Sequence, residues 1–202
     1  MINNVSLKCS CGSLQGLATS VSPETGNRIV CLCDDCQNYA KFLKREEIIL
    51  DKNGGTEIFQ LTPSQLKITH GKEHLKCVRL TDKGLLRWYA GCCKTPVANT
   101  MSSWKIPFVG IPHTFMHFGG DKKNQDKILG PIRAKVHGQY ATGEVPLDAH
   151  QKIPLGLIFR SLRLFLGAWM QGKNVPSPFF NVKTGQPNVT PKILTTKNQS
   201  TK

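Results

Sequence analysis

The sequence predicts a mainly β protein of several small antiparallel sheets, organised around clustered cysteines and carrying one amphipathic helix near its C-terminus. Short alternating segments are separated by turn-forming stretches such as 22–26 and 53–55. Seven of the eight cysteines lie in three tight groups, and only residues 155–171 have strong helical periodicity. We expect a core domain over residues 1–118 and a C-terminal extension over residues 119–202.

The central cysteine group is Cys31, Cys33 and Cys36, three thiols within six residues. Such a segment can bring three sulfur atoms to one zinc ion at about 2.3 Å each and leave the fourth tetrahedral position open. Open positions are typical of catalytic zinc sites, so these three residues are the candidate catalytic residues. The alternative is a second structural site, with water or a buried side chain as the fourth ligand.

Two cysteine pairs lie on either side of this group, Cys9 with Cys11 and Cys92 with Cys93. Two chelating pairs that are far apart in sequence commonly build one closed structural zinc site across two loops. We therefore expect two zinc ions, held by seven cysteines and forming part of the core domain.

Disulfide bonds are the alternative use of these cysteines. The chain begins without the basic and then apolar pattern of a signal peptide, so we expect a cytoplasmic location, where clustered cysteines more often bind metal. The eighth cysteine, Cys77, lies in the largely apolar segment 75–80 and is expected to be a small buried residue.

The charge of the chain is strongly basic, with a formal net charge of +14. No Asp or Glu follows Asp148, whereas basic residues continue to the end of the chain. Such a surface attracts an acidic small molecule, an anionic lipid surface or nucleic acid, and charge alone does not choose among them. A merely solvated basic face is the alternative. We expect the polar tail, residues 195–202, to be disordered.

The first predicted strand, residues 5–8, leads into the first cysteine pair. A short helix is predicted at 38–44, with Asp34 and Asp35 placed where negative charge favours a helix N-terminus. Residues 119–127 are polar and predict a loop. The other predicted strands are 48–50, 58–61, 66–69 and the two arms of a hairpin, 77–80 and 85–89.

The predicted helix, residues 155–171, is apolar on two sides. We expect the broader apolar face to pack on the core. A narrower stripe of Leu157, Leu164 and Ala168 on the opposite side predicts contact with a second copy of the protein or with an anionic membrane surface. The alternative is that these leucines are singly exposed. The broad face consists of Leu155, Ile158, Phe159, Leu162, Phe165, Leu166, Trp169 and Met170.

Three cysteine motifs together resemble those of the glutathione-dependent formaldehyde-activating enzyme family. They are Cys-x-Cys-Gly at 9–12, Cys-x-Cys-x-x-Cys at 31–36, and a strand that leads into Cys-x-Thr-Pro at 93–96. The resemblance covers roughly residues 7–100 and indicates a divergent branch. It implies a zinc-binding β-tent fold.

The resemblance also implies roles for the flanking cysteines. It places Cys9, Cys11 and Cys93 at a structural zinc ion. The family has its other late cysteine at the position of Ala90, so Cys92 supplies the fourth ligand from a shifted position, or the site is incomplete.

For the central group, the resemblance implies that Cys31, Cys33 and Cys36 hold a catalytic zinc ion, with Leu32 where the family usually has histidine. The implied function is a zinc-dependent carbon–sulfur lyase, or a protein that handles thiol adducts, with a small thiol or its adduct as partner. The alternative is a non-enzymatic zinc module that contacts a protein or, less readily, nucleic acid through its basic surface.

Overall fold

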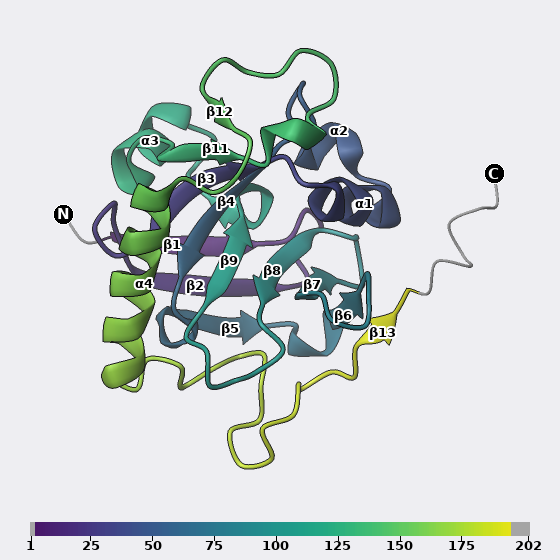
Figure 1. The fold of residues 1–202 in the computed structure, drawn as a ribbon. Coiled ribbons are helices and arrows are strands. Elements are labelled where there is room, and N and C mark those ends of the chain that lie inside the picture. The colour runs from purple at the N-terminus through teal and green to yellow at the C-terminus, as the bar shows by residue number, and fades with distance from the viewer. Residues whose placement is uncertain (1–2, 195–202) are drawn as a thin grey trace.

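The computed structural model describes residues 3–194 (Figure 1). The predicted disorder of 195–202 lies outside this range. Strand β1 (Asn3–Lys8) buries Val5 and Leu7 and exposes Ser6 and Lys8, the alternation of a half-buried strand. It belongs to a four-stranded antiparallel sheet, whose order is β10 (Met116–His117), β1, β2 (Gln15–Val21) and β5 (Leu66–His70).

The second sheet of the described residues has nine strands and is mixed. Strands β3, β7, β8 and β9 are buried along their whole length, because neighbouring segments cover both faces of the sheet there. The pairings β12–β11, β11–β3 and β13–β6 are parallel. In order, the strands are β12 (Ala149–His150), β11 (Ala134–Val136), β3 (Asn27–Cys31), β4 (Thr56–Leu61), β9 (Val109–Pro112), β8 (Pro96–Thr100), β7 (Leu86–Ala90), β6 (Leu75–Arg79) and β13 (Lys192–Ile193).

The helices agree only partly with the sequence prediction. Helix α1 (Asp34–Leu43) begins four residues before the predicted 38–44. The predicted strand at 48–50 is wrong, since residues 46–49 form the short helix α2 (Glu46–Ile49). The predicted loop at 119–127 is wrong in its second half, where α3 (Lys122–Leu129) begins after Asp121, whose carboxylate accepts the backbone N–H of Lys123 as an N-cap. The remaining helical turns are η1 (Pro63–Gln65), η2 (Lys72–His74), η3 (His113–Phe115) and η4 (Gly138–Tyr140).

The main core lies between the two sheets and includes residues from both ends of the chain. Trp88 on β7 is fully buried, and the rings of Phe179 and Phe180 pack on it at centroid distances of 5.0 and 6.2 Å. The C-terminal segment therefore helps to form the same core as the first half of the chain. Cys77 is also buried there, as predicted.

Helix α4 (Leu155–Met170) lies along one side of the molecule (Figure 1), and its bounds match the prediction within one residue. The predicted orientation is wrong: the narrow side with Leu157 and Ala168 is buried, and most of the broad apolar face is exposed. Polar contacts explain why this narrow side faces the rest of the protein. The Arg160 guanidinium donates to Asn27 Oδ1 at 2.7 Å and to the Pro23 carbonyl at 2.6 Å. A helix that anchors its arginine in this way turns its opposite face to solvent.

Strand outweighs helix among the described residues, so the predicted mainly β class with a C-terminal helix is confirmed. Within residues 3–194, no helix combines the length and the apolar character that are needed to cross a membrane.

Candidate metal centres

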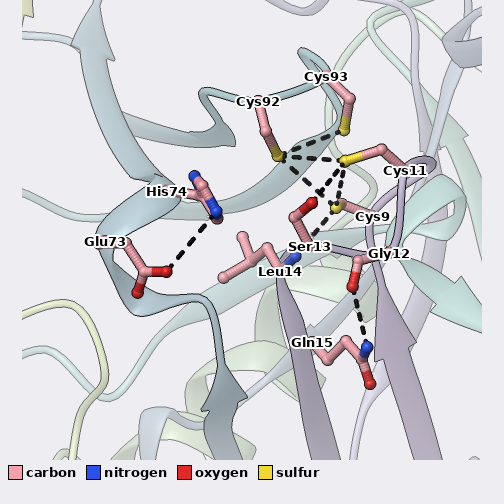
Figure 2. A network of polar contacts seen from close by, with 10 residues as sticks. All are labelled: Cys9, Cys11, Gly12, Ser13, Leu14, Gln15, Glu73, His74, Cys92 and Cys93. Atoms are coloured by element: carbon pink, nitrogen blue, oxygen red, sulfur yellow. Dashed lines mark hydrogen bonds and ion pairs between the residues drawn. The ribbon is translucent and has the colours of Figure 1, made fainter.

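The four cysteines of the two flanking pairs converge where the β1–β2 turn meets the β7–β8 turn (Figure 2). The Sγ atom of Cys92 lies 3.3 Å from that of Cys11, 3.9 Å from that of Cys9 and 3.8 Å from that of Cys93. Four sulfurs at about 2.3 Å from a tetrahedral zinc ion are about 3.8 Å from one another. The four-cysteine cluster therefore has the size of a tetrathiolate zinc site.

The first pair lies on a tight turn after β1. Gly12 adopts a φ of +80°, a left-handed conformation that favours glycine, and its N–H donates to the Cys9 carbonyl. Burial raises the pKa of the Cys9 thiol, and the Leu14 N–H, which donates to Cys9 Sγ at 3.2 Å, opposes that rise.

The second pair lies after β7 and is fastened directly to the first. The Ser10 N–H donates to Thr95 Oγ1 at 3.0 Å, and Arg45 donates to Ser10 Oγ at 2.6 Å. Hydrogen bonds from Ser10 and Thr95 outweigh the opposing effect of burial and lower the pKa of Cys93 to about 5. Burial, followed by the neighbouring thiols, raises the pKa of Cys92 to about 12.

The three remaining clustered cysteines meet at the junction of β3 and α1. Cys31 ends β3, Cys33 is the N-cap residue of α1, and Cys36 lies in the first helical turn. Their Sγ atoms lie within 4.8 Å of one another, and Cys31 and Cys33 are 3.3 Å apart. The N-terminal end of a helix carries partial positive charge, which favours thiolates there.

A buried amide fixes the loop that carries this three-cysteine cluster. The Gln37 side chain donates to the carbonyls of Leu32 and Tyr140, at 2.8 and 2.7 Å. The Leu32 N–H in turn donates to the Val136 carbonyl. The hydrogen bonds to Tyr140 and Val136 tie the loop to the segment around β11. The mixed sheet therefore helps to set the positions of the sulfur atoms.

Arg87 lies beside the three-cysteine cluster, and the sequence reasoning missed it. Its side chain is 3% exposed, with Nη1 3.9 Å from Cys36 Sγ and Nη2 3.6 Å from an Asp35 carboxylate oxygen. The guanidinium also lies over the Tyr39 ring at 5.3 Å. A basic residue in the otherwise apolar strand 85–89 was the available signal, because buried arginines are almost always paired with a negative group.

The residues of the three-cysteine cluster fit a dication. The three thiols cannot all ionise alone, since hydrogen bonds with Cys33 and Cys36, together with burial, raise the pKa of Cys31 far above its usual value. Within residues 3–194, no fourth Cys, His, Asp or Glu joins the group. Thr56 lies directly opposite Cys31 in the β3–β4 pairing, and its buried hydroxyl has no partner among the described residues. Three soft sulfur donors within 4.8 Å of one another match the donor set of a metal ion such as zinc.

Two hollows of the described surface flank α4, and no cysteine lines either of them. Access to the three-cysteine cluster is from the side of Cys33, which is partly exposed, since Cys31 and Cys36 are buried.

The chain belongs to DUF6151, a family of unknown function whose model matches residues 1–190. No curated protein matches the chain. A crystal structure of a protein from Rhodobacter sphaeroides is similar to 61% of this chain and to 96% of its own length, with 13% sequence identity and a TM-score of 0.42. A likeness of this size assigns no function.

Proposed function

We propose that this protein binds two zinc ions, one structural and one that presents an open position to a small thiol. Cys9, Cys11, Cys92 and Cys93 hold the structural ion, because four converging sulfurs close the tetrahedron. Cys92 then supplies the ligand that the resemblance leaves open at Ala90. This site fastens the β1–β2 turn to the β7–β8 turn.

The second ion is held by Cys31, Cys33 and Cys36. The observation that carries this proposal is that three sulfurs converge with no fourth Cys, His, Asp or Glu among residues 3–194. A zinc ion in such a site favours the thiolate form of an incoming thiol at neutral pH. The reaction class that we propose is formation or cleavage of a carbon–sulfur bond in a small thiol adduct, as in the glutathione-dependent formaldehyde-activating enzymes that the sequence resembles.

The protein side chains contribute charge balance and orientation. Three thiolates and one dication leave a net charge of −1 in a buried place, and the Arg87 guanidinium beside it offsets that charge while also pairing with the partly exposed Asp35 carboxylate. The Thr56 hydroxyl lies on the same side of the sheet as Cys31, because directly opposed residues share a face. It is therefore available to donate to a thiolate or to a bound ligand.

A non-enzymatic zinc module is the second candidate. The observation that favours it is the burial of the three-cysteine cluster, in which Cys31 and Cys36 are buried and Cys33 alone is partly exposed. In that case the fourth position is closed by water, and the basic surface contacts a partner.

Metal analysis and a thiol titration separate these functions. Protein made with adequate zinc is expected to contain two zinc ions per chain, and one ion or none contradicts the two-site proposal. In cobalt-substituted protein, glutathione is expected to change the thiolate-to-metal absorption, because it enters the open position. A spectrum that is unchanged up to millimolar glutathione supports the non-enzymatic module.

Two cysteine variants assign the roles of the clusters. Cys33→Ser is expected to abolish the spectral response and keep the fold, whereas Cys9→Ser is expected to unfold the protein because closed zinc sites contribute folding energy. The reverse order of stability means that the structural and open sites are exchanged.

A further inference from the structure

The outer face of α4 is an apolar surface without a partner in the described chain. Six large apolar side chains on it are each more than half exposed. Soluble monomers rarely leave so much contiguous apolar surface uncovered. We call this surface the outer face; it consists of Leu155 (72% exposed), Phe159 (70%), Leu162 (59%), Leu166 (57%), Trp169 (57%) and Met170 (76%).

A groove extends the outer face on one side of the helix. It has a volume of about 550 Å³ and lies between α4 and the segment 101–108. Phe108 and Phe165 both line it, with ring centroids 5.4 Å apart. Lys105 and Ser161 are the polar residues among those that line it, and none is acidic.

Basic residues flank the outer face on both sides. Lys105 borders it at the groove, and Arg163 and Lys173 border it at the hollow on the other side of the helix. Lys152 precedes the helix and is exposed. Glu24 is the acidic residue among those that line the second hollow, and Ser22 donates a hydrogen bond to it. The partner of this surface is therefore apolar at its centre and anionic around it.

A second copy of the chain does not have this chemistry. A two-fold interface places the same patch against itself, so the flanking cations of one copy meet those of the other. Glu24 is the one acidic residue among those that line the groove and the hollow, and it already accepts from Ser22, so the cations predominate and like charges across an interface oppose association. An anionic bilayer offers both the apolar interior and the negative surface.

We propose that the outer face of α4 docks this protein on an anionic phospholipid membrane. The helix lies in the plane of the surface, with the six apolar side chains at the boundary of headgroups and acyl chains. Lys105, Arg163 and Lys173 contact the headgroup phosphates. The helix of 16 residues is about 24 Å long at 1.5 Å per residue, which suits a helix lying on the membrane and not across it. This proposal does not depend on the metal sites.

The test is sedimentation of the full, metal-replete chain with vesicles. Binding is expected to vesicles of phosphatidylcholine mixed with phosphatidylserine, to fall sharply with phosphatidylcholine alone, and to weaken as salt is raised. The double variant Leu162→Gln, Leu166→Gln is expected to lose at least about tenfold in binding, because two exposed leucines no longer enter the bilayer. Arg163→Gln is expected to lose about fivefold.

Leu147→Gln is the matched control, because Leu147 is a fully exposed leucine in the loop before β12, outside α4. It is expected to bind as the wild type does. A wild-type protein that ignores anionic vesicles overturns the proposal, and so does a double variant that binds as tightly as the wild type. A dimer that the double variant dissociates, with no vesicle binding, assigns the outer face to a second copy and also overturns it.

Discussion

Replacing Arg87 with methionine tests whether the three-cysteine cluster carries a buried negative charge. Arg87 Nη1 lies 3.9 Å from Cys36 Sγ. Two opposite unit charges at that distance attract each other by about 4 kcal/mol at an effective dielectric constant of 20. That figure is an upper bound, because a bound dication neutralises most of the thiolate charge. Residues beside metal ligands typically contribute 10–100-fold in metal affinity, or about 1.4–2.7 kcal/mol. We expect a loss in this range for Arg87→Met.

The assay is competition with a chelator, read separately at the two sites through cobalt absorption. Affinity at the three-cysteine cluster is expected to fall, and affinity at the four-cysteine cluster to stay unchanged. Arg79→Met is the control, because it removes the same charge from the neighbouring strand β6, where Val78 and not Arg79 lies opposite Arg87. An affinity that changes by less than about twofold in Arg87→Met refutes the charge-balance argument.

Two further predictions concern the core. The pKa of Cys77 is raised to about 12, by burial in the first place, so at pH 8 its thiolate fraction is about a thousandfold below that of a free thiol. Iodoacetamide is expected to label it only after denaturation, and equal labelling rates before and after urea contradict this burial. Phe179→Ala is expected to cost about 3–5 kcal/mol in urea unfolding at fixed zinc, because its ring packs on Trp88. Val182→Ala is the control, because Val182 is exposed. Equal stability of the two variants would contradict the placement of Phe179 in the core.

The grouping of the cysteines could be predicted from the sequence because chelating spacing is local. A turn brings Cys9 to Cys11, and a helix N-terminus brings Cys33 to Cys36, whatever the rest of the chain does. Arg87 could not be placed, because only the β7 register brings it to Cys36 from 51 residues away. The parallel β11–β3 pairing could not be predicted either, because the three residues of β11 are too few to show a hydrophobic pattern.

Helix α4 shows a different limit. Hydrophobic periodicity locates apolar sides of a helix, but it does not reveal which side meets the protein. Here that choice is made by Arg160 and by the carbonyl groups of residues 23–26, contacts between segments more than 130 residues apart. A helix whose broader apolar side faces outward therefore has the same hydrophobic pattern in its sequence as a helix whose broader side packs on the core.

The four-cysteine cluster joins residues 81 and 83 positions apart, Cys11 with Cys92 and Cys9 with Cys92. A cross-link over such a loop removes about 4.5 kcal/mol of chain entropy from the unfolded state. The enclosed loop contains β2 to β7 and all three cysteines of the other cluster. With an ion in each cluster, as proposed, loss of the ion from the three-cysteine cluster leaves this loop closed, whereas loss of the ion from the four-cysteine cluster opens the loop that contains the other site.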